Sequence, residues 1–542
     1  MNFLLVAINA KYIHSNPAVF SLRSYADRVY PGVTSIYEST INNPLHTILS
    51  DICDQKPDAI GFSTYIWNIG IIRKLLNDLP KVLPNADIWL GGPEVSYHYE
   101  SLFSEYPCIR GIIVGEGESA FTRIVGQYVR SMKIVPEEGD DTINISKPVI
   151  GDPDFSDILN VALRERPSII GSELSDMDSL PFIYEEGMRE FSHRIVYYES
   201  SRGCPYRCSY CLSAVDKTVR FRSLPFVFRD LQFFLEEGIP QVKFIDRTFN
   251  SDKERAKAIW TYIHEHDNGK TNFHFEIAAD LLDKESIDLL RKMRPGQVKL
   301  EIGVQTTNTD TLQAINRPMT IRKLSKAVEE LSKNGNLILH LDLIAGLPYE
   351  GFRSFRNSFN DVYALRPTQL QLGFLKVLKG APIEDECEKF GIVRSSDPPY
   401  EVLSTRWLRF DELCELKNIE EMLELFYNTH QFDHTLALLL KAFDTPFDLF
   451  HALADFYKEK DLFHITPARS RRYEILLSFV EEKTTLYIEE IREALTLDFY
   501  LREVPKSRPD FVKEVPEKGR IDISQRDPVT GNFILLSDGS GD

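Results

Sequence analysis

Three cysteines, Cys204, Cys208 and Cys211, lie within eight residues and follow the apolar run 195–198. This C-x3-C-x2-C spacing places three thiols on one loop after a predicted strand. Thiolate sulfur holds iron–sulfur clusters, whereas zinc takes four protein ligands in structural sites and three plus water in catalytic ones. Three thiolates on a four-iron cluster would leave one iron open to a small ligand. The spacing therefore predicts a catalytic metal centre, with zinc or three buried thiols as alternatives.

The cysteines fall in a series of alternating strand and helix patterns between residues 190 and 385. Amphipathic segments such as 226–237 are predicted as helices. Six apolar runs are predicted as strands, at 194–199, 242–246, 273–277, 298–303, 338–344 and 370–374. Functional groups of parallel barrels lie at the carboxyl ends of the strands. Polar residues stand there in this chain, among them Asp246, Glu276 and Gln305.

Residues 1–131 form an earlier series of five strand and helix repeats. This alternation predicts a Rossmann-like, doubly wound parallel sheet that binds ligands at the carboxyl ends of its strands. Three of those ends read Ser63-Thr64, Gly91-Gly92 and Gly115-Glu116. Glycine permits close approach of a bulky flat ligand and also serves tight turns. The spacing alone favours neither role.

The remaining segments lack this alternation. Residues 132–189 gather acids, prolines and glycines and are predicted to form a linker. Residues 386–542 are rich in Leu, Glu, Phe and Tyr at helical spacing up to about residue 500. They are predicted to form a mainly α-helical C-terminal domain that ends in an irregular tail.

The length and composition bound the class of protein. A chain of 542 residues is long enough for about three or four domains. The net charge of −18 disfavours a large nucleic-acid surface. No apolar run approaches the ~20 residues of a membrane helix, and the N-terminus is predicted as a strand rather than a signal peptide. We therefore expect a soluble, cytoplasmic protein without a disulfide framework.

The ordered set of motifs resembles one enzyme family. Cys204, Cys208 and Cys211, with Tyr210 before the last cysteine, resemble the signature of radical S-adenosylmethionine (SAM) enzymes. The N-terminal repeats before this motif resemble the cobalamin-binding domain of the cobalamin (B12)-dependent members. The resemblance implies a partial (β/α)6 barrel of the TIM type, with a [4Fe-4S] cluster on the three cysteines and SAM on the open iron.

The resemblance also implies cofactor contacts. SAM would be surrounded by side chains or backbone of Tyr210, Asp246, Glu276, Gln305 and Gly346. Cobalamin would lie against Ser63, Thr64, Gly91, Gly92, Gly115 and Glu116. The loop after the first strand carries His14 but lacks Asp-x-His-x-x-Gly, so the lower face of cobalt is expected to have no histidine ligand. Catalytic residues are not assigned.

Members of this family cleave SAM to a 5′-deoxyadenosyl radical, and the commonest expected outcome is methyl transfer to an unactivated carbon. Rearrangement or cyclisation is an alternative. So is a methylthiotransferase-like, RNA-modifying enzyme, although its second cluster would need more N-terminal cysteines than Cys53 and Cys108. A non-catalytic cobalamin sensor is a third alternative. A small-molecule or peptide substrate and a reducing partner such as flavodoxin or ferredoxin are expected.

Overall fold

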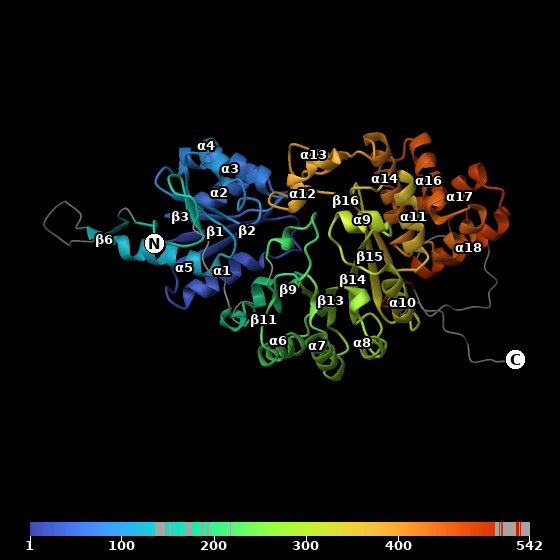
Figure 1. Cartoon of the computed structure of the whole chain (residues 1–542), viewed down its shortest axis with the longest axis horizontal. Helices are drawn as coiled ribbons and strands as arrows, with labels where there is room; N and C mark the ends of the chain where they lie inside the picture. The colour runs from blue at the N-terminus through green and yellow to red at the C-terminus, as the bar shows by residue number, and fades with distance from the viewer. Residues whose placement is uncertain are drawn as a thin grey trace.

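The computed structural model describes residues 1–135, 147–150, 153–168, 176–185, 188–191, 194–216, 218–503, 509, 511–512, 527–530 and 532. Three parts follow one another along its longest axis (Figure 1). A sheet with helices on both faces comes first, a curved parallel sheet lies in the middle, and a group of helices lies at the far end.

The N-terminal sheet has the strand order β2-β1-β3-β4-β5-β8. Its parallel strands are β1 (Phe3–Asn9), β2 (Thr34–Thr40), β3 (Ala59–Ser63), β4 (Asp87–Gly91) and β5 (Ile109–Ile113). The connecting helices are α1 (Pro17–Asp27), α2 (Leu45–Asp54), α3 (Ile69–Val82), α4 (Tyr99–Glu105) and α5 (Glu118–Ser131). The order reverses at β1, and ligands of such sheets bind beyond the carboxyl ends of the strands. The predicted doubly wound sheet is confirmed.

Part of the predicted linker belongs to this sheet. Strand β8 (Val161–Leu163) pairs antiparallel with β5. Upstream, the ring of Phe155 lies 4.8 Å from that of Trp89, and both are buried. A strand of three residues carries no readable periodicity, and it forms here because β5 offers an unpaired edge. The predicted linker, residues 132–189, also contains β6 (Met132–Val135), which pairs antiparallel with β7 (Lys147–Ile150). Several other parts of it lie outside the described residues.

The middle part is an open, all-parallel barrel with the order β16-β15-β14-β13-β12-β9. Its strands are β9 (Val196–Tyr198), β12 (Gln241–Phe244), β13 (Asn272–Ile277), β14 (Val298–Gln305), β15 (Ile338–Ala345) and β16 (Gln369–Phe374). The helices on its outside are α6 (Leu224–Glu236), α7 (Lys253–Glu265), α8 (Lys284–Leu290), α10 (Ile321–Ser332) and α11 (Phe352–Tyr363). The six predicted strands thus form a partial (β/α)6 barrel.

The two faces of the barrel strands differ in polarity. In β14, Val298, Leu300 and Ile302 are buried, whereas Lys299 and Glu301 between them are partly exposed. Strand β15 alternates in the same way. Apolar side chains therefore pack beneath the helices, and charged side chains line the inside of the barrel.

The C-terminal helices close the open edge of the barrel. They are α14 (Phe410–Met422), α15 (Asp433–Leu439), α16 (Pro446–Glu459), α17 (Arg469–Lys483) and α18 (Ile488–Arg502). Asn428 bonds both backbone groups of Leu370 in β16, at 2.9 Å each. The hydroxyl of Tyr427 donates to the carbonyl of Pro367 nearby. An unpaired strand edge invites aggregation, and the side chain of Asn428 satisfies part of this one. Most of the predicted irregular tail beyond residue 503 lies outside the described residues.

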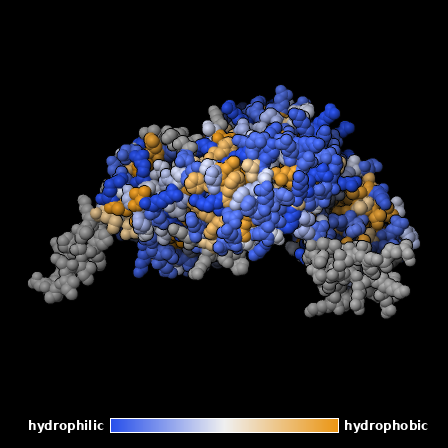
Figure 2. All heavy atoms as spheres, turned by 90° about the horizontal axis from the view of Figure 1, so that it is seen from below, coloured by the Kyte–Doolittle hydropathy of each residue, from blue (hydrophilic) through white to orange (hydrophobic). Residues whose placement is uncertain are grey.

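Hydrophilic side chains dominate the face drawn in Figure 2, with small apolar patches among them. Within the described part of the chain, no helix is both long and apolar enough to span a bilayer.

Candidate functional site

A two-stranded hairpin holds the start of the cysteine loop at the carboxyl end of β9. Strand β10 (Ser201–Arg202) pairs antiparallel with β11 (Arg220–Phe221). Gly203 follows with φ +96°, and a Cβ on this residue would lie 2.2 Å from the carbonyl oxygen of Thr218. Only glycine fits both the backbone angle and this close approach. Its position therefore explains the glycine that precedes Cys204.

Two of the three thiols are buried and lie beside hydrogen-bond donors. Cys204 and Cys208 are buried, and Cys211 is half-buried. The Cys204 sulfur lies 3.6 Å from the hydroxyl of Thr248, and the Cys208 sulfur lies 3.6 Å from Nη1 of Arg317. Burial raises the pKa of the Cys208 thiol, and the Arg317 guanidinium opposes this rise. Hydrogen bonds to sulfur of this kind tune iron–sulfur clusters.

Among the described residues, no three His, Cys, Asp or Glu side chains come close enough to hold one metal ion. The cluster that the resemblance implies on Cys204, Cys208 and Cys211 stays a prediction.

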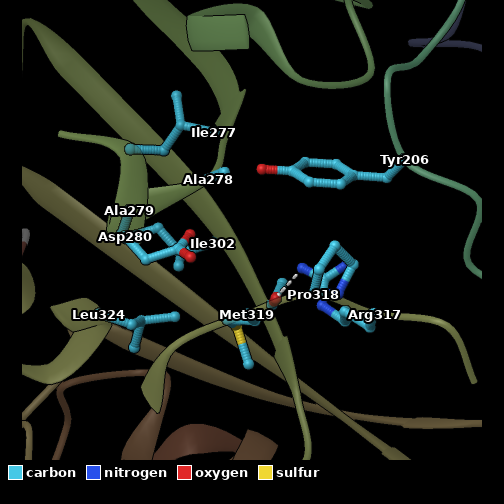
Figure 3. A pocket seen from close by; sticks show the side chains of 11 residues that line it. Tyr206, Ile277, Ala278, Ala279, Asp280, Ile302, Arg317, Pro318, Met319 and Leu324 are labelled. Carbon is cyan, nitrogen blue, oxygen red and sulfur yellow. Dashed lines mark hydrogen bonds between the residues drawn. The ribbon is translucent and has the colours of Figure 1, made fainter. Parts of the chain in front are cut away.

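Arg317 connects the cysteine loop to the end of β14. Its guanidinium donates to the carbonyl of Gly303, and Nη1 lies 3.2 Å from the hydroxyl of Tyr210. Burial opposes the charge of Arg317, but nearby Tyr210 and Cys208 raise its pKa. Arg317 and Tyr206 line one side of a small pocket, and Asp280 and Leu324 lie on the opposite side (Figure 3). Residues 277–279, 302–303 and 318–319 complete its lining.

Asp246 supports the cysteine loop from below. It is 1% exposed, and it accepts hydrogen bonds from the backbone N–H and hydroxyl of Ser200 at 2.8 and 2.6 Å and from the Ser201 hydroxyl at 2.7 Å. Burial raises the pKa of Asp246 to about 6, although these hydrogen bonds oppose the shift. The structure therefore gives this carboxylate a role in positioning β10, beside the SAM contact that the resemblance implies.

Glu276 and Gln305 lie at the ends of β13 and β14, close to Asp342 of β15. Burial raises the pKa of Glu276 to about 7 and that of Asp342 to about 8, and the carboxylate of Glu301 adds to both shifts. Gln305 has φ +70° and is 9% exposed, and its Oε1 atom has no hydrogen-bond partner among the described residues. Three acceptor groups thus gather at the barrel mouth. The sequence reasoning did not select Asp342, although its position in the alternation of β15 marks it as facing inward.

Around Glu301, the register partner of Glu276, the charged side chains inside the barrel satisfy one another. Glu301 lies 3.2 Å from Lys243 and 2.8 Å from His274. Burial opposes the charge of Glu301, but the hydrogen bond from His274 and the nearby Lys243 lower its pKa below the usual range. Lys299 donates to Gln369 at 2.7 Å. These pairs explain how a barrel can keep charges inside.

Gly346 has a packing reason for being glycine. Its φ is +90°, and a Cβ there would lie 2.7 Å from Cγ1 of Val402 in β18 (Val402–Ser404). The residue therefore allows β18 to approach the loop after β15. The predicted contact of this backbone with SAM stays a prediction.

Glu350 ends the same loop and is fully buried. It accepts hydrogen bonds from the hydroxyls of Thr306 at 2.7 Å and Ser358 at 2.8 Å. Burial raises its pKa from 4.5 to about 7 against these hydrogen bonds. Ionisation of Glu350 in the folded state is thus less favourable than in the unfolded chain.

The contribution of Glu350 to the free energy of unfolding should therefore fall as the pH rises from 4.5 to 7 and then level off. In Glu350→Gln this contribution, about 3 kcal/mol over the window, should be absent. Urea unfolding of both proteins at pH 4.5 and pH 8 measures the difference, with exposed Glu265→Gln as the control. Equal pH dependence in Glu350→Gln and the unsubstituted protein would contradict this expectation.

The predicted cobalamin loops of the N-terminal sheet contact one another. Thr64 is fully buried, and both its N–H and its hydroxyl donate to the carbonyl of Gly91. A Cβ on Gly92 would lie 2.5 Å from the carbonyl oxygen of Thr64. Ser63 accepts a hydrogen bond from Asn16 at 3.0 Å. Gly115 has φ +76°, and no atom lies within 4 Å of the position of an added Cβ. Thr64 and Gly92 therefore pack against each other and hold the loops after β3 and β4 together, whereas the Cα of Gly115 faces open space.

Glu116, which is predicted to lie near cobalamin, and His14, in the loop after β1, both contact the barrel. Glu116 pairs with Arg202 at 3.2 Å and Arg220 at 2.8 Å. His14 lies 2.6 Å from the hydroxyl of Tyr197 in β9. The carboxyl edge of the N-terminal sheet therefore meets the cysteine-loop end of the barrel. The expectation that cobalt has no histidine ligand stays a prediction.

Comparison with protein families divides the chain in the same order. Residues 4–125 match the B12 binding domain, and residues 198–362 match the radical SAM superfamily. Residues 388–526 match a protein family of unknown function (DUF4080).

Among curated proteins, the cobalamin-dependent radical SAM methyltransferase TokK of Streptomyces tokunonensis is 22% identical over 62% of this chain and 50% of its own length. The 2-(S-pantetheinyl)-carbapenam-3-carboxylate methyltransferase of Streptantibioticus cattleyicolor is 23% identical over 67% of this chain and 53% of its own. This chain thus spans about half the length of these relatives.

A solved structure shares the fold. The radical SAM methyltransferase TsrM of Kitasatospora setae, with cobalamin and a [4Fe-4S] cluster bound, matches with a TM-score of 0.56 and 15% identity. The match covers 74% of this chain and 82% of that one.

Proposed function

We propose that this chain, which belongs to the radical SAM enzymes that carry an N-terminal B12 binding domain, is a cobalamin-dependent methyltransferase. One observation carries the proposal. The loop with Cys204, Cys208 and Cys211 lies at the carboxyl end of the barrel, where the same end of the N-terminal sheet meets it. The two cofactor sites that the resemblance implies would thus share one interface.

The three cysteines would hold a [4Fe-4S] cluster, and the loops after β3, β4 and β5 would hold cobalamin. When bound, the cluster supplies an electron for SAM cleavage and cobalamin supplies a methyl carrier. Arg317 donates toward the sulfur of Cys208, and the hydroxyl of Thr248 lies 3.6 Å from the sulfur of Cys204, where it would donate to a thiolate. Their hydrogen bonds would stabilise thiolate over thiol and raise the reduction potential of the centre.

The groups at the barrel mouth would bind SAM. Oε1 of Gln305 would accept a hydrogen bond from a hydroxyl or the ammonium. Burial raises the pKa of Asp342 to about 8, so this carboxyl group would donate a hydrogen bond in its protonated form as well as accept one. Glu276 would add a second carboxyl group, and Tyr210 would lie against the ligand beside Arg317. Asp246 would act by holding Ser200 and Ser201 in place.

The test is anaerobic purification, reconstitution with iron, sulfide and hydroxocobalamin, and product analysis after reduction with titanium(III) citrate in the presence of SAM. We expect about four irons per chain, bound corrinoid, 5′-deoxyadenosine and S-adenosylhomocysteine. 5′-Deoxyadenosine without S-adenosylhomocysteine would instead favour rearrangement or cyclisation. Absence of both products from protein with a full cluster would overturn the proposal. About eight irons would favour the methylthiotransferase-like alternative.

A further inference from the structure

Two arginines face each other across the hairpin that starts the cysteine loop. Arg202 of β10 and Arg220 of β11 are register partners, and their side chains are 18% and 9% exposed. Like charges directly opposite in an antiparallel pair repel. The hairpin can form only if carboxylates compensate the two guanidinium groups.

Some of these carboxylates come from the barrel part of the chain. Arg202 donates to both oxygens of Glu199, at 2.9 and 2.8 Å. Arg220 donates to Asp216 at 2.7 Å. These contacts are local, and they would stabilise the hairpin without the N-terminal domain.

The other carboxylates come from the N-terminal domain. Glu118, in the first turn of α5, lies 2.9 Å from Nη2 of Arg202, and its side chain is 8% exposed. Glu116 bridges both arginines, at 3.2 Å from Arg202 and 2.8 Å from Arg220. Because Arg202 precedes Cys204 by two residues, one network of charge-assisted hydrogen bonds joins the cysteine loop to the edge of the sheet. Figure 1 shows β11 at the boundary between the two parts.

A second contact ties the sheet to the other side of the barrel. Glu94 follows Gly92 by two residues and is 5% exposed. It lies 2.7 Å from Nζ of Lys379 and accepts a hydrogen bond from the hydroxyl of Tyr400. Next to it, a Cβ on Gly380 would lie 2.4 Å from the ring of Tyr97. With the loops after β4 and β5 both fixed, the sheet edge cannot rotate freely against the barrel.

We propose that Arg202 is a positioning residue, which sets the distance and orientation between the cysteine loop and the B12-binding edge through Glu116 and Glu118. This inference rests on the proposed function. Transfer of the methyl group of SAM requires the sulfonium centre and the methyl carrier to be aligned, and a misplacement of about 1 Å can cost 100-fold in rate. Cleavage to 5′-deoxyadenosine needs only the barrel.

The test uses three variants: Arg202→Gln, Glu118→Gln, and the double variant that carries both substitutions. Each is compared with the control variant Arg294→Gln. Arg294 pairs with Asp267 before β14, at the opposite end of the barrel, and serves as a matched control. We expect iron content and 5′-deoxyadenosine within about twofold of the unsubstituted protein. S-adenosylhomocysteine should fall roughly tenfold or more in each single variant. The double variant should fall no further, since both substitutions remove one shared interaction.

Amide hydrogen exchange of residues 114–118 gives a readout that needs no cofactor. It should be faster in Arg202→Gln and unchanged in Arg294→Gln. If Arg202→Gln loses iron and both products while Glu118→Gln is normal, Arg202 supports only the cysteine loop and the inference is wrong. Unchanged S-adenosylhomocysteine in both single variants would overturn it as well. If the unsubstituted protein forms neither product, the proposed function fails, and the exchange rates decide the positioning role separately.

Discussion

Cys208→Ala should abolish the formation of 5′-deoxyadenosine from SAM. Cys208 is buried on the loop between Arg317 and the neighbouring thiols, and no other cysteine of the described chain lies in that loop besides Cys204 and Cys211. Substitutions that affect only the partners of metal ligands cost about 10- to 100-fold in affinity or activity. Removal of a ligand itself should therefore lower the formation of 5′-deoxyadenosine by more than about 100-fold. The measurement is 5′-deoxyadenosine per chain after anaerobic reduction, together with iron content.

Cys53→Ala is the matched control, because Cys53 is a half-buried thiol of α2 in the N-terminal domain. It should retain iron and activity. A Cys208→Ala protein that still cleaves SAM would contradict the assignment of the three cysteines to the cluster. Loss of activity in Cys53→Ala would point instead to a general sensitivity of the fold to thiol removal.

The strands of both sheets were predictable, because their side chains follow simple patterns. Residues such as Leu300 and Ile302 alternate with Lys299 and Glu301, and this period of two survives in the structure. The cysteine spacing indicates a candidate metal centre for a similar reason, since its three predicted ligands lie on one short loop. Local patterns need no knowledge of the rest of the fold.

The contacts across the interface were not predictable in this way. Glu116 was predicted to face cobalamin, but the structure pairs it with Arg202 and Arg220, which lie about a hundred residues further along the chain. Thr64 was assigned by its place at a strand end, yet it is fully buried beneath the loop of Gly91. Sequence places such residues at the correct edge of a sheet. Whether they contact a ligand or another domain depends on tertiary packing.

Gly203→Ala should prevent the cysteine loop from loading iron. Gly203 has φ +96°, where residues with a Cβ are strained, and the new methyl group would lie 2.2 Å from the Thr218 carbonyl oxygen. Strain at such an angle alone costs about 1 to 3 kcal/mol. The clash adds to this strain, because the contact is with the backbone carbonyl of Thr218, which leads into β11 and cannot rotate away. The loop must then leave the hairpin, and Cys204 moves with it. Iron per chain after reconstitution should fall to about a tenth or less.

Gly269→Ala separates the two causes. Gly269 has φ +72°, but no atom lies within 4 Å of an added Cβ. This variant carries the angular strain without the clash, so it should load iron normally and lose only a little stability. If Gly203→Ala also loads iron normally, the hairpin does not fix the cysteine loop. The ion pairs of Arg202 could then not position that loop against the N-terminal sheet.

If Gly203→Ala loses iron but still binds corrinoid, the B12-binding edge is formed independently of the cluster. The ion pairs would then join two sites that are each built by their own domain.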